Sequence, residues 1–372
     1  MSKRILANKK LSENQFVIGI SAVFLGLFAG AILMLLLGEN PLSAFYYLFK
    51  GGLMNIERIG NSLATATILV LTGLSISFAF KTGLFNIGAA GQMLIGGLLG
   101  TYIALTWVLP RPLMLIVLIL AAMIGGALWG LLPGVLKAFF NVHEVVSTIM
   151  MNWIAYWVVY YAVQGHLKSE GIETESRAIA EINTLRSTWL SNIFQSEYIN
   201  YGIILAIIAI FLIRIILDKT TLGFELKAAG YNKDAAKYAG INVNRNISFS
   251  MMIAGALSGL AGLTYYVGYS LNMQVGVMPS QGFDGIAVAL LGAGSSIGVA
   301  FSATFFGILH VGKGFMSANA SVPPEIADAI IAVIIYFTAT SLLIKRFWEK
   351  ISDTSFAKKI SKRFHKKQDL RS

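Results

Sequence analysis

The chain has 372 residues, of which 56% are hydrophobic and only 13% are charged, and its mean hydropathy is +0.70. Because soluble domains carry about 25% charged residues, this composition excludes an ordinary soluble protein and indicates an integral membrane protein. The net charge of +11 is typical of basic loops beside membrane spans, so we expect no nucleic-acid partner.

The apolar runs last about 20 residues, which predicts helical spans and excludes a barrel of ~10-residue alternating strands. We therefore expect an all-α polytopic membrane protein with about ten transmembrane helices. The eighth of them is too short to cross as a straight helix, so a broken or re-entrant element is expected there. The predicted spans are Phe16–Leu37, Asn61–Phe80, Leu84–Val108, Leu113–Leu136, Val145–Val163, Tyr201–Leu217, Ile247–Tyr269, Phe283–Leu291, Ile297–Val311 and Ile326–Ile344.

The distribution of charge predicts the orientation of these spans. Both ends of the chain are basic, and Lys and Arg favour the cytoplasmic side, so both termini are expected in the cytoplasm. Residues 1–15 form a basic N-terminus, residues 16–344 the transmembrane domain, and residues 345–372 a basic tail that contacts membrane lipid. Residues 164–200 form an acidic extracellular loop, and residues 218–246 form a charged cytoplasmic segment.

Two pairs of similar stretches suggest an internal repeat. "LFNIGAAGQMLIGG" in the first half is similar to "GFDGIAVALLGAG" in the second, and "HEVVSTIMMNWIAYW" is similar to "PEIADAIIAVIIYF". Five spans in each half would make the two weakly similar halves inverted in the membrane, which is a common transporter plan.

Polar residues interrupt the third and eighth spans. Asn86 and Gln92 lie among glycines, a pattern typical of a helix start that lines a cavity, although close glycine packing is the alternative. Asp284 opens the eighth element, where it can cap the helix or face a vestibule. All three residues are candidate contacts of a substrate.

The fifth span carries polar residues at every fourth position: Glu144, Thr148, Asn152 and Tyr156. This spacing places them on one stripe of a helix, which should face protein or a water-filled path rather than lipid. We favour a stripe that lines a translocation route, with helix–helix hydrogen bonding as the alternative. The same helix carries the aromatic residues Trp153, Trp157, Tyr160 and Tyr161. We favour a Trp/Tyr belt at the membrane interface over stacking of these rings on nucleobases.

The stretch "YNKDAAKYAGINVNRN" (231–246) predicts a short capped helix on the cytoplasmic side. Asn232 is a good N-cap, Asp234 and Lys237 complement the helix dipole, and Gly240 suits the position after the helix. A helix of about seven residues is near 10 Å long and too short to be stable alone, so it must dock on something. The alternative is an ordinary loop helix that rests on its own protein.

The same stretch resembles the cytoplasmic coupling motif of ABC importer permeases. Asp234, Ala235, Ala236 and Gly240 match it, although Asp replaces the usual Glu and the leucine-proline that often follows is missing. "GLFNIGAAGQMLIGG", "HEVVSTIMMNWIA" and "GFDGIAVALLGAGSSIG" resemble the branch that transports simple sugars and nucleosides, most closely the nucleoside permeases. The resemblance covers roughly Asn61 to Thr340.

This resemblance implies a transport subunit of the bacterial plasma membrane that imports nucleosides by alternating access. It further implies an ATPase subunit that couples at Asn232, Asp234, Ala235, Ala236 and Gly240, a second and different permease chain, and an extracellular substrate-binding lipoprotein. ATP and Mg²⁺ would bind the partner ATPase, since the chain has no G-x-x-x-x-G-K-[ST] motif. No cofactor, metal site or catalytic residue is expected on this chain, whose four histidines are scattered.

Two alternatives remain open at this point. The same architecture could import a simple sugar. An ion-coupled secondary transporter would share the broken helices, but it usually needs an ionisable residue deep in the membrane. Glu144, Arg214 and Asp284 all lie near the ends of predicted spans, which favours the ATP-driven importer.

Overall fold

The structure, a computed structural model, describes residues 15–340 and is all-helical over that range, with fourteen α-helices and a few isolated β-bridges. The predicted tail 345–372 and nearly all of the predicted N-terminus 1–15 lie outside the described residues. The helices are α2 (Gln15–Leu36), α3 (Pro41–Leu53), α4 (Ile56–Phe80), α5 (Ala89–Thr106), α6 (Arg111–Phe140), α7 (Glu144–Ala162), α8 (Thr188–Phe194), α9 (Gly202–Lys219), α10 (Thr221–Tyr231), α11 (Lys233–Tyr238), α12 (Val243–Leu263), α13 (Gln281–Leu291), α14 (Ser296–Ala320) and α15 (Glu325–Ala339).

Three short turns complete the described chain. The π-helical turn η1 (Val163–Leu167) extends α7, the 3-10 turn η2 (Glu181–Asn183) precedes α8, and the π-helical segment η3 (Thr264–Ser270) extends α12. Together, η2 and α8 give the predicted loop 164–200 a partly helical structure.

Seven helices in the described part are long and apolar enough to cross a membrane, which makes the chain a multi-pass membrane protein. They overlap the first, second, third, fourth, fifth, seventh and ninth predicted spans, although the third begins at Ala89 rather than at Leu84. The other three predicted spans overlap α9, which carries charges in its last turns, α13 and α15, and residues 341–344 of the tenth lie outside the described residues. At eleven residues α13 is short, as expected for the eighth span.

The helix α3 was not predicted, because the sequence was searched for apolar runs of about 20 residues and α3 has only 13. Local signals do specify it. The Asn40 side chain caps its N-terminus by accepting a hydrogen bond from the Leu42 amide at 3.0 Å, and Pro41 occupies the first helical position.

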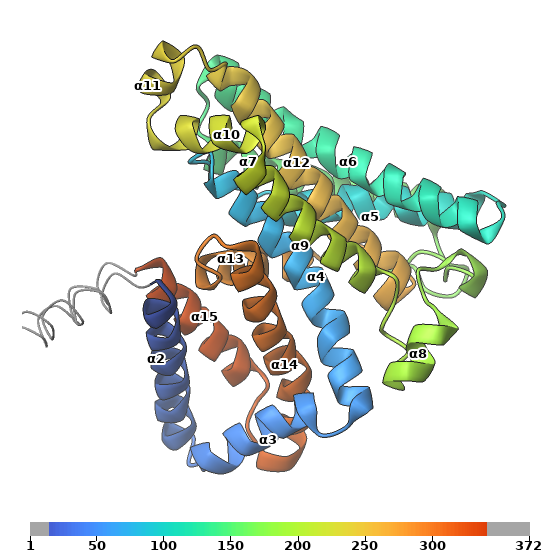
Figure 1. Ribbon diagram of the computed structural model, residues 1–372. Helices are drawn as coiled ribbons and strands as arrows, with labels where there is room; N and C mark the ends of the chain where they lie inside the picture. Colours follow the sequence, from blue (N-terminus) through green and yellow to red (C-terminus); the bar gives the residue numbers. More distant parts are fainter. Residues whose placement is uncertain (1–14, 341–372) are drawn as a thin grey trace, which may run out of the picture.

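Helix α4 lies at the centre of the molecule and is buried along nearly its whole length. In Figure 1 it passes between two groups of helices: α5, α6, α7 and α12 on one side, and α2, α3, α13, α14 and α15 on the other. Ser and Thr side chains in a membrane span commonly face other helices, where they can form hydrogen bonds. The burial of α4 among other helices therefore explains why it carries several of them.

Helices α6 and α12 pack closely along their length through glycines. A Cβ atom added at Gly255 would collide with the carbonyl oxygen of Gly126, and one added at Gly259 would collide with that of Ala122. Small residues allow helix backbones to approach in this way, so these two helices form one rigid pair.

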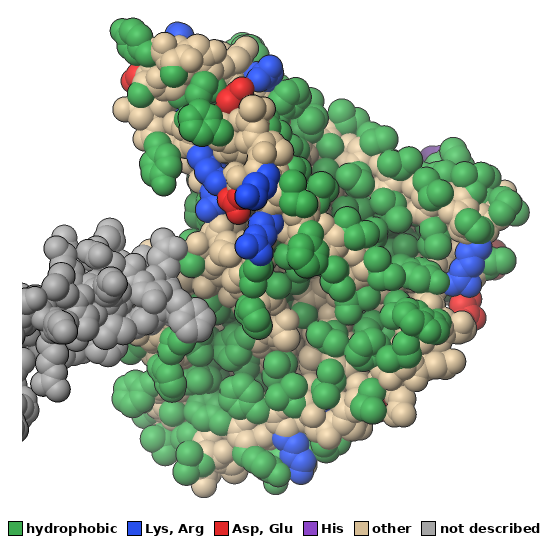
Figure 2. Space-filling view, in the orientation of Figure 1, with side chains coloured by type: hydrophobic (Ala, Val, Ile, Leu, Met, Phe, Trp, Pro, Cys, Tyr) green, Lys and Arg blue, Asp and Glu red, His purple; other side chains and the backbone are tan. Residues whose placement is uncertain are grey.

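The molecule has two ends. At the first, which we call the α11 end, α10 and α11 lie beside the corner between α4 and α5, where Gly230 packs directly on the carbonyl of Lys81. Gly294, in the turn between α13 and α14, lies against the Lys81 side chain at the same end. Figure 2 shows Lys and Arg side chains gathered there, while apolar side chains cover the flanks. The opposite end, near α8, is called the α8 end.

Candidate translocation route and coupling segment

The corner between α4 and α5 holds a buried cluster of polar side chains. Asn86 and Gln92 form a reciprocal amide pair, with Nδ2 to Oε1 at 3.0 Å and Nε2 to Oδ1 at 3.2 Å. The Asn86 Nδ2 also lies 3.3 Å from Ser75 Oγ, which in turn accepts a hydrogen bond from Ser258 at 2.8 Å. We call Ser75, Asn86, Gln92 and Ser258 the amide cluster. Its members come from α4, the corner, α5 and α12, so it joins four parts of the fold.

Asn152 on α7 completes this corner. Its Oδ1 accepts a hydrogen bond from the Gly91 amide at 2.8 Å, and its Nδ2 donates to the Ile87 carbonyl at 3.0 Å. The residue before α5, Gly88, has no side chain to cap the helix, so Asn152 serves as a cap from a different helix. Asn152 is buried, and both ends of its amide are occupied by backbone. This geometry supports the helix–helix alternative for Asn152.

The rest of the predicted stripe also faces protein. The Thr148 hydroxyl donates to the carbonyl of Glu144 at 2.7 Å, one turn back on α7. The Glu144 carboxylate lies 2.9 Å from Lys137 Nζ on α6, and both side chains are mostly buried. Tyr156 is half-buried, and its hydroxyl points toward Gly276 in the loop before α13. The stripe thus runs along α5, α6 and this loop.

The aromatic residues of α7 lie on the flank of the molecule. Trp157 is 50% exposed and Tyr161 is 70% exposed. Side chains exposed on an apolar flank suit an interfacial belt, which was the favoured interpretation.

Asp284 lies in the first turn of α13, with its Oδ2 at 3.3 Å from His310 Nε2 on α14. Both side chains are mostly buried. Eleven helical residues extend about 16 Å, roughly half of a hydrocarbon core about 30 Å thick. The start of α13 therefore lies inside the helical body. Asp284 thus lies near a helix end, as predicted, but this end lies within the protein, and its contact with His310 could not be predicted because it joins two helices.

The predicted short helix on the 218–246 segment is confirmed as α11. The Asn232 Oδ1 accepts hydrogen bonds from the amides of Asp234 and Ala235, both at 3.0 Å. Gly240 follows the helix with a φ of +80°, in the left-handed region that favours glycine. Ala236 is buried against the protein, whereas Asn232, Asp234, Ala235 and Gly240 are exposed. Four of the five candidate coupling residues are therefore free to meet a partner.

Two tyrosines of this segment were missed by the sequence analysis. Tyr231, the last residue of α10, is 92% exposed, and Tyr238, the last residue of α11, is 95% exposed. Large aromatic side chains left bare in a polar segment are typical of binding surfaces. The available signal was an aromatic residue at each end of a charged helix.

The segment is tied to α12 by a charged contact. The Glu225 Oε2 on α10 accepts from Asn246 Nδ2 at 2.9 Å and from Arg245 Nη2 at 3.1 Å. The hydrogen bond from Asn246, followed by the contribution of Arg245, holds the pKa of the Glu225 carboxyl below its usual value. At neutral pH the carboxylate is thus charged and links the two helices.

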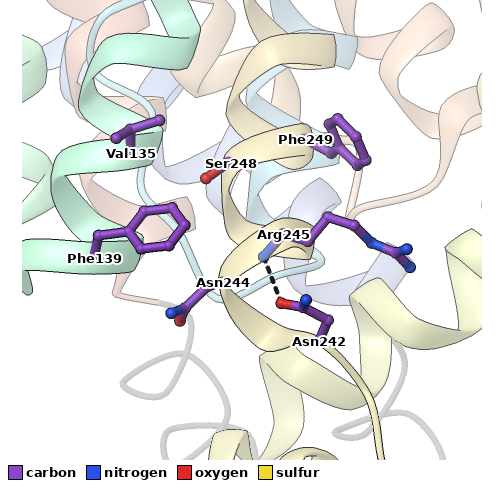
Figure 3. Close-up of a pocket in the computed structure, with 7 residues that line it drawn as sticks. All are labelled: Val135, Phe139, Asn242, Asn244, Arg245, Ser248 and Phe249. Carbon is purple, nitrogen blue, oxygen red and sulfur yellow. Dashed lines mark hydrogen bonds between the residues drawn. The ribbon is translucent and has the colours of Figure 1, made fainter.

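A groove of ≈ 400 Å³ lies at the α11 end between the end of α6 and the start of α12 (Figure 3). The Ser248 Oγ in its wall is buried and has no protein hydrogen-bond partner. None of the predicted site residues lines the groove. Its lining residues are Val135, Phe139, Asn242, Asn244, Arg245, Ser248 and Phe249.

Comparisons with known proteins show which proteins this chain is similar to. Residues 58–339 match the model of a family described as the permease component of branched-chain amino acid transport systems. The chain is 37% identical over 335 residues to the nucleoside ABC transporter permease NupB of Lactococcus lactis subsp. cremoris, covering 88% of this chain and 92% of that protein.

It is 39% identical over 338 residues to the guanosine ABC transporter permease NupP of Bacillus subtilis, covering 91% and 96% of the two chains. It is also 29% identical over 336 residues to the glucose ABC transporter permease TsgB13 of Haloferax volcanii, covering 88% of each. No solved structure matches the chain.

Proposed function

We propose, since the chain belongs to the family of permease components of branched-chain amino acid transport systems, that it is the membrane-spanning subunit of an ATP-driven importer of nucleosides. The observation that carries the proposal is the similarity, over about nine-tenths of the chain, to two permeases whose names specify nucleosides or guanosine. Like the family, the chain is a transport subunit and not an enzyme.

Binding and hydrolysis of ATP with Mg²⁺ belong to a separate ATPase subunit in this proposal. The ATPase docks at the α11 end through the exposed residues of the coupling segment, with Tyr231 and Tyr238 as apolar anchors. Ala236 keeps α11 attached to its own protein. The gathering of Lys and Arg at this end supports its placement in the cytoplasm.

The complete transporter has two further partners. A second, different permease chain lies beside this one in the bacterial plasma membrane, and an extracellular lipoprotein delivers the nucleoside at the α8 end. Both termini then face the cytoplasm, with about ten spans in two inverted halves. The support is the family resemblance together with α9, α13 and α15, which supplement the seven longer helices.

The route of the substrate lies beside α4, where the two groups of helices meet. Alternating access requires the two groups to change their relative position, while each stays rigid within itself. Asn86, Gln92, Thr148 and Asn152 fix the shape of one wall through their hydrogen bonds. The half-buried Tyr156 and the mostly buried Asp284 are the candidates for direct contact with substrate. Glu144 closes the wall at the α11 end through Lys137.

Uptake of radiolabelled uridine and guanosine tests this function. Cells that lack the chain are compared with cells in which it is restored, with ribose and galactose as competitors. The proposal expects restored uptake that the sugars do not inhibit. Uptake inhibited by sugars would instead support a simple-sugar importer, an alternative consistent with the similarity to a glucose permease.

The second alternative, an ion-coupled transporter, is favoured by one observation, the Asp284–His310 pair inside the helical body. A protonophore and a sodium-free medium discriminate it from an ATP-driven importer. We expect uptake to continue when the ion gradients collapse and ATP is maintained, and to stop when ATP is depleted. Uptake that follows the gradients would support the ion-coupled transporter, and this pair would then be the first candidate for mutation.

A further inference from the structure

Three tyrosine rings form a continuous row near the α8 end. The centroids of Tyr198 and Tyr269 are 4.7 Å apart with an interplanar angle of 31°, and those of Tyr269 and Tyr265 are 5.9 Å apart with an angle of 18°. Tyr265 and Tyr269 belong to η3, and Tyr198 lies in the loop after α8. We call these residues the tyrosine row.

Polar side chains from other elements border the row. The Tyr265 phenol lies near the side chain of Gln281 at the start of α13, and the Tyr269 phenol lies near that of Thr65 on α4. One turn before Thr65, the Asn61 Oδ1 accepts a hydrogen bond from Ser196 at 2.6 Å. The row therefore connects both groups of helices across the central helix α4.

The row also runs inward from one end of the molecule. Tyr198 lies in the loop at the α8 end, whereas Gln281 opens a helix that starts about 16 Å from the turn at the α11 end. A helical tyrosine side chain leans toward the N-terminus of its own helix, which for α12 is at the α11 end. The tyrosine row thus leads from the α8 end to the inner start of α13.

An interfacial belt does not explain Tyr265 and Tyr269. Belt residues such as Trp157 and Tyr161 are at least half exposed on the flank. By contrast, Tyr265 and Tyr269 are half-buried and their phenols face neighbouring helices, while Tyr198 is 42% exposed in the loop where the row begins. The two rings are also carried by a π-helical segment, a rare geometry that is frequent at functional sites.

We propose that the tyrosine row is a stacking track for the nucleobase along the outer half of the translocation route. This inference rests on the proposed nucleoside function and adds the recognition element for the base. Every nucleobase has a π-face, so a row of rings accepts purines and pyrimidines alike. Thr65, Asn61 and Gln281 offer hydroxyl and amide groups to the ribose and the base edges.

Replacement of single rings tests the track. The variants Tyr265→Leu and Tyr269→Leu are compared with Tyr265→Phe and Tyr269→Phe in cells that depend on this permease for nucleoside uptake. The initial uptake rate is measured against nucleoside concentration and divided by the amount of permease in the membrane. Loss of one base–aromatic stack should raise KM for uridine and guanosine by roughly tenfold. The Phe variants keep the ring and should stay within about twofold of the wild type. Tyr161→Leu, on the lipid-facing flank, is the matched control and should leave KM unchanged.

If the Leu variants fail to accumulate, substitution by a larger ring decides the question. Tyr269→Trp should lower KM for guanosine more than for uridine, because a purine overlaps the larger ring more fully. Leu variants with unchanged KM and only reduced Vmax or thermal stability would overturn the inference, as would a Trp variant without effect on either KM. Failure of the nucleoside function itself is distinguishable, because it would appear as absent nucleoside uptake by the wild type.

Discussion

Asn152 on α7 accepts a hydrogen bond from the amide of Gly91 on α5 at 2.8 Å, and through this contact it caps a helix to which it does not belong. Replacement by Leu leaves the Gly91 N–H and the Ile87 C=O buried without partners. An unsatisfied buried group costs about 1–3 kcal/mol, so we expect Asn152→Leu to lower the thermal unfolding temperature by several degrees. The purified permease in nanodiscs is suited to this measurement.

Asn152→Asp keeps the acceptor for Gly91 but places a second oxygen against the Ile87 carbonyl, so it should also be destabilising. Met150→Leu, exposed on the same helix, is the matched control and should leave the unfolding temperature unchanged. If Asn152→Leu unfolds at the wild-type temperature but changes the preference among nucleosides, its side chain faces substrate rather than the helix start.

Substitution of the exposed Tyr238 tests ATPase docking without destabilising the fold of the permease. Since its side chain is 95% exposed, Tyr238→Ser removes almost no contact within the permease, whereas Ala236→Glu would disturb a buried residue. Truncation of an aromatic anchor at an interface costs about 2 kcal/mol or more. We expect at least a tenfold loss of ATPase co-purification and of uptake, at normal membrane levels. Tyr161→Ser, exposed on α7, is the control, and full coupling in Tyr238→Ser would exclude it as an anchor.

The glycine contact between α6 and α12 predicts a strong packing effect. A methyl group at Gly255 would overlap the carbonyl oxygen of Gly126, so Gly255→Ala forces the helices apart. Overpacking of this kind costs about 1–3 kcal/mol. Gly314 on α14 has open space around its Cα, and Gly314→Ala should be neutral or slightly stabilising. Equal unfolding temperatures for the two variants would contradict the close packing.

The contact between Glu225 and α12 predicts an acid-sensitive attachment of α10. A carboxyl whose pKa is lowered in the folded state stabilises that state above its ordinary pKa of 4.5 and loses this contribution as the pH falls through the lowered value. Hydrogen exchange of the α10 amides, corrected for intrinsic rates, should therefore increase below about pH 4.5.

Glu225→Gln keeps an acceptor for Asn246 but cannot titrate, so its exchange should be faster at neutral pH and flat in acid. Glu170→Gln, in the exposed loop at the opposite end, is the control. An unchanged acid response in Glu225→Gln would assign the sensitivity to another group.

Features set by neighbouring residues could be predicted from the sequence. The cap, charges and terminal glycine of α11 are all local, and the structure contains each of them. The start of α5 near Asn86 follows likewise from glycines and amides within a few residues. Seven of the predicted spans needed only hydropathy over about 20 residues.

Features that depend on distant residues could not be predicted in this way. Asp284 and His310 belong to different helices, and the stacking of Tyr198 on Tyr269 requires the loop after α8 to fold back onto η3. The role of Asn152 is of the same kind, since its spacing on α7 shows that it is shielded from lipid but not which backbone it meets. Tertiary packing determines these contacts, and the periodicity of residues along one helix does not predict which other element that helix contacts.

The contact of Gly230 with the carbonyl of Lys81 has a mechanical consequence. Backbone meets backbone there, so no rotatable side chain can absorb a small displacement of α10. A shift imposed on α11 by a partner must therefore move the peptide chain that leads, five residues later, to Asn86. The stiffness of this backbone contact, rather than the strength of any single bond, would determine how much of a displacement of α11 is transmitted to the amide cluster.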